Sequence, residues 1–377
     1  RVSRGLGDVY KRQAQRYKNE IIEEVPEVDA VLGTTSYGDI LKAIREAMEG
    51  KHFQEFKDID YLPEKLGKRV LTTGGHFGYL KIAEGCDKHC TYCIIPKLRG
   101  KFRSVPMERL VTQAKEMAEE GVKELILVAQ ETTVYGTDIY GKKSLHILLK
   151  ELCKIKGIRW IRVLYCYPEE IYDELIQTMK EEKKICHYLD LPIQHASDRI
   201  LKRMGRRTTQ AELVEIVNKL RREIPDIVLR TTLISGFPGE TQEDHEELMS
   251  FVDEMEFDRL GVFTYSPEED TPAATMPDQV AEEVKEARRD EIMELQQEIS
   301  YDKGTDRIGQ ELLVMIEGKV ADESAYIGRT YGDAPKVDGY IFVQTGELLM
   351  TGDFAKVRVT GALEYDLIGE LADEYTE

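Results

Sequence analysis

Three cysteines lie within eight residues, in the run Cys86-Asp-Lys-His-Cys90-Thr-Tyr-Cys93. This C-x3-C-x2-C spacing puts three thiolates in one tight loop, where each can bind one iron of a [4Fe–4S] cube. The fourth iron of such a cube has no protein ligand, and an open iron can chelate a small molecule. The spacing therefore predicts a cluster that acts as a chemical reagent as well as an electron carrier.

A structural zinc ion is the alternative occupant of this loop. Structural zinc usually takes four ligands, commonly as two spaced pairs of cysteine or histidine. No second pair follows here, and His89 lies between two cysteines, where its ring is badly placed to join them. We therefore favour the cluster. The other cysteines, Cys153, Cys166 and Cys186, are scattered in apolar segments and are expected to be buried, unreactive thiols.

Alternating strands and helices surround the cysteine loop. The predicted strands span residues 79–85, 124–129, 160–166, 187–193, 227–234 and 260–265. Helix-sized intervals separate them: Pro106 opens one helix, and Thr241 with Asp244 forms the capping box of another. Successive strand–helix units demand right-handed crossovers and a parallel sheet, and six units suit a partial barrel better than a closed eight-fold one. The cysteines follow the first strand, at the sheet edge where active sites of such folds gather.

The amino-acid composition argues against several classes of function. The chain has 377 residues, 52 basic and 71 acidic side chains, and a formal charge of −19. Binding to nucleic acid or to an anionic membrane demands clustered positive charge, so we expect neither. No apolar run approaches ~18 residues, and the first residues lack the apolar core of a signal peptide. Six cysteines are too few for a disulfide scaffold. We expect a cytoplasmic protein of several domains.

Three segments flank the strand–helix repeat. Residues 1–13 are basic and are left unassigned as a possible foreign leader, and residues 14–66 form a small α/β stretch. Short strands separated by Gly and Asp over residues 308–377 predict a small antiparallel β-barrel. Residues 311–377 hold 14 acidic and 5 basic side chains, so this barrel suits a basic protein surface better than RNA phosphates.

These motifs resemble the radical S-adenosylmethionine (SAM) superfamily, and longer stretches resemble its methylthiotransferases. Those stretches are YLKIAEGCDKHCTYCIIPKLRG, LVAQETTVYG, YLDLPIQHASDRILKRMGRR and LISGFPGETQEDH. The C-terminal barrel resembles the TRAM domain of that family, and with GRTYGDAPKVDGYIF it resembles the RimO branch. The resemblance implies an α/β fold: a remnant N-terminal methylthiotransferase domain at 14–66, a partial (β/α)6 radical SAM barrel at 72–302 and a TRAM β-barrel at 308–377.

The resemblance also implies an activity. Members of the RimO branch add a methylthio group to the β-carbon of an aspartate in the small-subunit ribosomal protein S-twelve (uS12). They cleave SAM reductively to a 5′-deoxyadenosyl radical, with electrons from a low-potential donor of the flavodoxin or ferredoxin type. The acidic TRAM barrel would dock this basic partner through charge complementarity. Two alternatives stay open: a tRNA methylthiotransferase of the MiaB type, and a non-enzymatic, metal-bearing module that binds the ribosome.

Individual positions follow from the resemblance. Cys86, Cys90 and Cys93 would hold the [4Fe–4S] cluster that binds SAM. Tyr92 would contact the adenine through its backbone, and Gln130 would hold the methionyl amine. A guanidinium fits a carboxylate, so the methionyl carboxylate would be held by Ser197 and by Arg207 or its neighbour Arg206. The stretch that resembles the adenine-contacting strand contains Ile234, Gly236 and Gly239.

One departure concerns a second cluster. Family members carry three further cysteines in an N-terminal domain, where they bind a second [4Fe–4S] cluster involved in sulfur donation. Residues 1–78 contain no cysteine, so the chain resembles a truncated family member. We therefore expect this chain to cleave SAM without completing methylthiolation.

Overall fold

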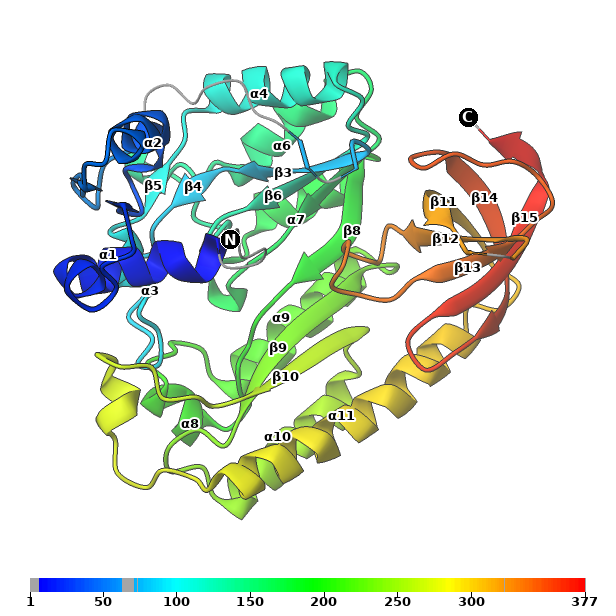
Figure 1. Ribbon diagram of the computed structural model, residues 1–377. Helices are drawn as coiled ribbons and strands as arrows, with labels where there is room; N and C mark the ends of the chain where they lie inside the picture. Colours follow the sequence, from blue (N-terminus) through cyan, green and yellow to red (C-terminus); the bar gives the residue numbers. More distant parts are fainter. Residues whose placement is uncertain (1–6, 63–70, 73, 322, 377) are drawn as a thin grey trace.

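The computed structural model describes residues 7–62, 71–72, 74–321 and 323–376, and of residues 7–13, 19, 22 and 373–376 it describes the backbone only. Figure 1 shows an N-terminal unit in blue, a central sheet in cyan to yellow-green, and a C-terminal barrel in orange and red. The N-terminal unit contains α1 (Gly7–Glu24), β1 (Ala30–Leu32), α2 (Ile40–Met48) and β2 (Phe53–Glu55). Strands β1 and β2 pair in parallel. Helix α1 begins inside the stretch 1–13, which the sequence left unassigned.

The central sheet has six parallel strands in the order β10-β9-β8-β7-β6-β3. The strands are β3 (Phe77–Lys81), β6 (Glu124–Val128), β7 (Trp160–Val163), β8 (Ile185–Asp190), β9 (Val228–Ser235) and β10 (Arg259–Thr264). Every pairing between neighbours is parallel. Strands β3 and β10 are the two edges, so the predicted partial barrel of six strands is confirmed.

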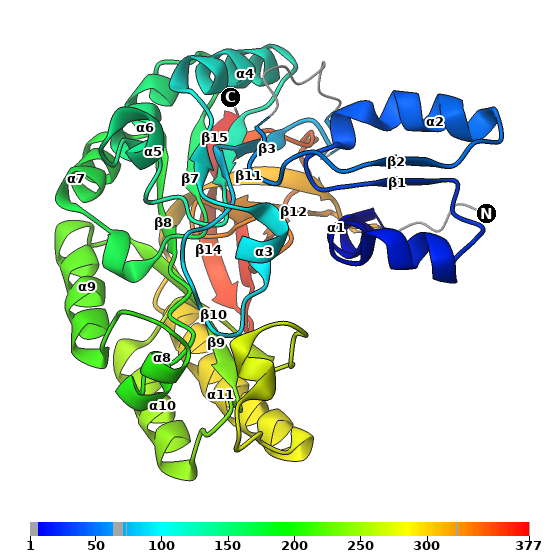
Figure 2. The same ribbon diagram turned by 90° about the vertical axis from the view of Figure 1, so that its left-hand side faces the viewer.

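Helices cover the outer face of this sheet as an arc, which Figure 2 shows from the side. They are α4 (Met107–Glu119), α6 (Leu145–Cys153), α7 (Asp173–Glu181), α9 (Gln210–Glu223), α10 (Gln242–Met255) and α11 (Glu282–Thr305). Pro106 precedes α4, and capping boxes begin α9 at Thr209 and α10 at Thr241, as predicted for α10. Short helices α3 (Ile95–Arg99), α5 (Thr137–Tyr140) and α8 (Asp198–Arg203) lie in the connections.

The two faces of the sheet have different partners, because successive side chains of a strand point to opposite sides. On β6, Leu125 and Leu127 are buried in the large apolar core beneath the helices. Between them, Ile126 faces the inner side and packs in a second cluster with Phe77 and Trp160. Part of the inner face is therefore also covered.

The C-terminal barrel supplies that cover. Its strands are β11 (Glu311–Lys319), β12 (Ala325–Thr330), β13 (Ile341–Gln344), β14 (Phe354–Ala362) and β15 (Leu367–Thr376), closed in the order β11-β12-β13-β15-β14. Met315, Ala334 and Phe354 join the inner cluster, and the Phe354 ring meets Trp160 edge-on at 4.9 Å. One pairing differs from the antiparallel prediction, because β13 and β15 are parallel. Strand β14 lies between them in the sequence and runs antiparallel to β15.

Buried charges join the barrel to the sheet. Glu124, at the start of β6, accepts hydrogen bonds from Arg162 Nε at 2.8 Å and from Arg329 Nη2 of the barrel at 2.7 Å. All three side chains are fully buried. Burying a charged side chain is costly unless it is paired and hydrogen-bonded. These contacts therefore favour the observed position of the barrel on the sheet. Within the described residues, no helix is both long and apolar enough to cross a membrane.

Candidate functional site

The cysteine loop is held at its entry by a small hairpin. Strand β4 (Ala83–Glu84) pairs with β5 (Arg103–Ser104), and Cys86 N donates to Gly100 O at 3.2 Å. Gly85 between them has φ +80°, and a Cβ there would lie 2.0 Å from Lys101 O. Glycine is therefore required where the chain turns into the loop. Cys86 and Cys90 are buried, and Cys93 is half-buried.

The far side of the loop is tied to two distant segments. Thr91 N donates to Met204 O at 2.9 Å, and Thr91 O accepts from Ala273 N at 2.9 Å. Tyr167, which follows β7, has its hydroxyl 3.8 Å from Cys90 Sγ. The Arg206 guanidinium lies 4.3 Å above the Tyr167 ring. A tyrosine and a buried arginine therefore lie beside the cysteines.

The three cysteines fit a cluster in which each thiolate binds its own iron. Among the residues that the structure describes, no three His, Cys, Asp or Glu side chains are grouped to hold one ion. A cube does not need such convergence, because its ligands bind separate irons. Burial, with smaller contributions from the charges of Cys90 and Glu131, raises the pKa of Cys86 to about 11, although a backbone hydrogen bond from Lys88 acts to lower it. Arg206 beside Cys90 offers positive charge to such a negative assembly.

Several buried polar atoms around the loop have no hydrogen-bond partner among the described residues. They include Gln130 Oε1, Glu131 Oε2, Thr208 Oγ1, and Arg206 Nε and Nη1. A buried polar atom without a partner costs about 1–3 kcal/mol, so such atoms mark a place where a polar ligand would bind. Burial raises the pKa of Glu131 to about 7, although hydrogen bonds from Thr133 act to lower it. The surroundings of the cysteines therefore fit a zwitterionic ligand such as SAM.

An apolar patch borders the loop on the other side. Tyr92 and Ile234 both pack against a buried cluster that contains Phe237 and Tyr265. The rings of Tyr92 and Phe237 meet edge-on at 6.3 Å, and those of Phe237 and Tyr265 at 5.3 Å. The structure thus brings together two of the residues predicted to contact adenine. Aromatic and aliphatic side chains of this kind suit the flat face of a base.

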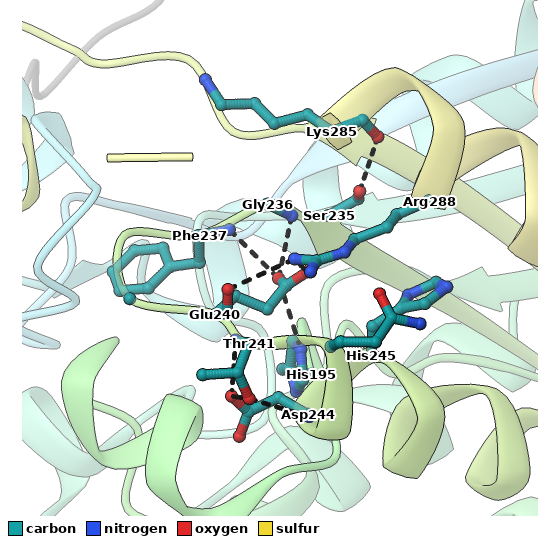
Figure 3. Close-up of polar contacts among 12 residues, drawn as sticks. His195, Ser235, Gly236, Phe237, Glu240, Thr241, Asp244, His245, Lys285 and Arg288 are labelled. Carbon is teal, nitrogen blue, oxygen red and sulfur yellow. Dashed lines mark hydrogen bonds and ion pairs between the residues drawn. The ribbon is translucent and has the colours of Figure 1, made fainter. Parts of the chain in front are cut away.

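Glu240 fixes the loop that follows β9, as Figure 3 shows. Its carboxylate accepts from Gly236 N at 2.8 Å and Phe237 N at 3.1 Å, and Arg288 Nη1 lies 2.8 Å from the other oxygen. His195 Nε2 lies 3.5 Å from Glu240 Oε2. Burial alone would raise the pKa of Glu240, but His195 and Arg288 lower it, so its net pKa is below the usual range. The ionised carboxylate holds Phe237 in the apolar patch.

The predicted carboxylate ligands are placed differently from one another. Arg207 is exposed, whereas Arg206 is buried against Tyr167, so Arg206 is the arginine that lies at the site. The two are adjacent at the end of α8, where one side chain turns inward and the next points to solvent. Ser197 begins α8, and its hydroxyl donates to Asp244 Oδ1 at 2.7 Å. The Ser197 proton is therefore used within the protein, which leaves its oxygen as an acceptor.

Other conspicuous side chains have structural partners. Ser197 N donates to His195 Nδ1 at 3.0 Å, so that buried ring carries its proton on the nitrogen facing Glu240. Arg103 bonds Asp60 and the Ile59 carbonyl, which ties the basic run after the cysteines to the N-terminal unit. Of the three cysteines expected to be buried, Cys166 and Cys186 are buried, whereas Cys153 at the end of α6 is only half-buried. Burial raises the pKa of Cys186 to about 12.

Two residues of the site were missed at the level of sequence. Glu131 and Tyr167 line the cysteine loop, and neither was named beforehand. Each follows the carboxyl end of a parallel strand, β6 and β7, where polar side chains are candidates for a site. Glu131 is the residue next to Gln130, the position that the resemblance implied for the methionyl amine.

Comparison with known proteins gives matches along most of the chain. Residues 80–252 match the radical SAM superfamily, and residues 308–372 match the TRAM domain. A protein of Lachnoclostridium phytofermentans named ribosomal protein uS12 methylthiotransferase RimO is 64% identical over 356 residues, which cover 94% of this chain and 81% of that protein. Proteins of the same name from Clostridium perfringens and Clostridioides difficile are 53% and 49% identical, each covering 96% of this chain and 80% and 81% of their own lengths.

Proposed function

Because the chain belongs to the RimO family of radical SAM methylthiotransferases, we propose that it acts on ribosomal protein uS12, in the reaction that adds a methylthio group to the β-carbon of an aspartate. The chain as given would carry out SAM cleavage and hydrogen removal, because residues 1–78 hold no cysteines for the second cluster that sulfur donation needs. One observation carries the proposal. The three-cysteine loop lies at the carboxyl end of the parallel sheet, and segments beside it carry buried polar atoms that have no hydrogen-bond partner among the described residues. That arrangement supports a cluster beside a bound zwitterion.

The chain's own residues have separate tasks in this reaction. Cys86, Cys90 and Cys93 would hold the [4Fe–4S] cluster. When bound and reduced, the cluster supplies the electron that cleaves SAM, which starts hydrogen removal from an unactivated C–H bond. Arg206 would hold the methionyl carboxylate, since a guanidinium forks onto a carboxylate. A carboxylate offers the charge that an ammonium prefers, which favours Glu131 for the methionyl amine.

The proposed protein partner is inferred from the charge of the TRAM barrel. Among the described residues of the TRAM barrel, the exposed acidic side chains are Glu311, Glu323, Glu347, Glu364 and Glu370. Others are used internally: Asp333 pairs with Arg259 at 2.6 Å, and Asp338 with Arg230 at 3.3 Å. The exposed set supports steering toward a basic protein. Electrons would come from a low-potential donor of the flavodoxin or ferredoxin type.

The test begins with metal content. The chain is reconstituted without oxygen, and iron, sulfide and zinc are counted per polypeptide. About four irons are expected, because one group of three cysteines serves one cube. One zinc without iron would contradict the enzyme and favour a binding module. Eight irons would contradict the single-cluster expectation that follows from a cysteine-free residue range 1–78.

The second step measures chemistry and partner. With a strong reductant, the loaded chain should release 5′-deoxyadenosine from SAM, and Cys90→Ala should abolish this release. Cys153→Ala is the matched control, since that half-buried thiol lies at the end of α6 and should not matter. The chain should bind uS12. Salt-sensitive binding of tRNA without affinity for uS12 would instead favour the tRNA-modifying reaction.

A further inference from the structure

Tyr165, just after β7, has an unusual backbone. Its φ is +60°, in the left-handed region, and Gln194 after β8 has φ +73°. A non-glycine residue in a sparsely populated conformation costs about 1–3 kcal/mol and persists only where its surroundings hold it. Such residues gather at active sites. Both positions follow strands at the carboxyl end of the sheet, the edge at which the cysteine loop lies.

Both backbone polar groups of Tyr165 are fixed. Tyr165 N donates to Asp190 Oδ2 at 3.1 Å. Its carbonyl accepts from Thr132 N at 3.1 Å and from Thr132 Oγ1 at 3.0 Å. Two residues further on, the Tyr167 hydroxyl lies 3.8 Å from Cys90 Sγ. The segment that contains Tyr165 therefore reaches the cysteine loop through Tyr167.

The Tyr165 ring is open to solvent although its neighbours are not. Tyr165 is 48% exposed, whereas Leu164 is 8% and Cys166 0% exposed. Tyr165 therefore presents an exposed aromatic ring at the carboxyl end of the sheet, the edge at which the cysteine loop lies.

A chain of charged contacts runs from this backbone to the TRAM barrel. Asp190, which accepts from Tyr165 N, pairs with Arg230 Nη1 at 2.7 Å. Arg230 Nε lies 3.3 Å from Asp338 Oδ1, in the loop between β12 and β13. Asp338 in turn accepts from the Tyr188 hydroxyl at 2.7 Å and from Ala334 N at 2.8 Å. The docked barrel thus supports the residue that carries the strained backbone.

We propose that Tyr165 positions the peptide segment bearing the target aspartate, and that the TRAM loop holds Tyr165 in place through Asp338, Arg230 and Asp190. The proposal rests on the proposed function, because it names how the same site receives its protein substrate. A tyrosine offers an apolar ring and a polar hydroxyl at a small cost in side-chain entropy, which suits contact with a peptide. The barrel would then serve the reaction twice, as a docking surface and as a support for this contact.

The experiment uses the reconstituted chain and a uS12-derived peptide whose target aspartate carries deuterium on its β-carbon. Two quantities are measured: the peptide Kd by fluorescence anisotropy, and the fraction of 5′-deoxyadenosine that contains deuterium. The carbon–deuterium bond breaks homolytically and the deuterium ends on the 5′ carbon, so this fraction reports how well the substrate is placed. Total 5′-deoxyadenosine formed without peptide serves as the measure of SAM cleavage alone.

Tyr165→Ala should weaken peptide binding about tenfold, the effect of 1.4 kcal/mol. The deuterated fraction should fall several-fold, while SAM cleavage without peptide stays within about twofold of the wild-type rate. Tyr165→Phe should retain most of both. Asp338→Asn should reproduce part of the defect, because it loosens the support of Asp190. Tyr301→Ala on α11 is the matched control, since that tyrosine is also 48% exposed, and it should change neither quantity.

The outcomes separate this inference from the proposed function. A wild-type chain that neither cleaves SAM nor binds the peptide would contradict the proposed function. A wild-type chain that does both, with Tyr165→Ala unchanged in Kd and in deuterium transfer, would overturn the inference alone. Loss of SAM cleavage by Tyr165→Ala in the absence of peptide would also overturn it, because the residue would then act on the cluster or SAM.

Discussion

At the scale of single residues, the site depends on charged groups that the protein buries without satisfying them. Arg206 is the clearest case, because its guanidinium covers the Tyr167 ring while Nε and Nη1 lack partners among the described residues. Arg206 Nη2 donates to Pro192 O at 3.1 Å and lies 3.8 Å from Glu169, which fixes the side chain from one end only. Two buried N–H groups of Arg206, on Nε and Nη1, are thus available to bind a carboxylate.

Arg206→Gln should therefore weaken SAM binding. Hydrogen bonds to charged groups contribute about 1.5–3 kcal/mol, which corresponds to a Kd raised about tenfold to a hundredfold. Isothermal titration of SAM into the reconstituted protein measures the change. Arg207→Gln is the control, because Arg207 is exposed and its loss should leave the Kd within about twofold. An equal effect of the two variants would show that Arg206 is not the ligand.

These residues also show what a sequence can and cannot reveal about a site. The cysteine ligands could be predicted because their spacing within one loop can be read directly from the sequence. The choice between Arg206 and Arg207 was not, since it depends on which of two adjacent side chains faces Tyr167 after folding. Glu131 was missed although it lies beside Gln130. Its role appears only after folding, when burial leaves one carboxylate oxygen, Oε2, without a partner among the described residues.

At the scale of elements, the loop after β9 links the apolar patch to the helices. Gly236 has φ +69°, and Glu240 accepts from its backbone N–H. Ser235 Oγ donates to Lys285 O at 2.8 Å, and Lys285 Nζ donates to Tyr265 O at 2.8 Å. Helix α11 thus supports this loop from behind, as Figure 3 shows. The strand and the helix were predicted from periodicity, but their mutual support depends on folding.

Gly236→Ala should disturb this support. A Cβ would lie 2.1 Å from Lys285 Cγ, and the positive φ is unfavourable for alanine. We expect a loss of about 1–3 kcal/mol in the free energy of unfolding and weaker binding of SAM, because Phe237 shifts with its neighbour. Chemical denaturation and SAM titration measure the two effects. Gly318→Ala is the control, since a Cβ there meets nothing within 4 Å, and wild-type stability for Gly236→Ala would refute the expectation.

At the scale of the whole molecule, the acidic TRAM barrel has two kinds of carboxylate. Those on its exposed surface, such as Glu347 and Glu364, face solvent. Those at the sheet contact side chains outside the barrel: Asp333 and Asp338 pair with Arg259 and Arg230, and Glu317 bonds His76, just before β3. The sequence gives the number of these acidic side chains, but it does not show which are exposed and which are paired, because their partners lie far away along the chain. The barrel is therefore bound to the sheet by electrostatics as well as by apolar packing.

Acid should weaken this interface before the helices melt. Burial alone would raise the pKa of Glu124, Glu317 and Asp333, but their cationic partners lower it, and each net pKa is below its usual value. A carboxylate with a lowered native pKa contributes stability above its unfolded pKa of about 4, and that stability is lost as the pH falls through the native pKa. Asp338 acts the other way, because burial raises its pKa.

Trp160 allows the interface to be followed directly. It is the single tryptophan of the chain and packs edge-on against Phe354 of the barrel at 4.9 Å. Its emission should shift to the red below about pH 4, at a higher pH than the loss of helical circular dichroism. Glu124→Gln should lower stability at neutral pH by about 3–5 kcal/mol and flatten the acid transition, since it leaves Arg162 buried without its carboxylate and removes one of the two carboxylates that Arg329 binds. Coincident loss of both signals would mean that the barrel and the sheet unfold as one unit, and that these ion pairs do not control their separation.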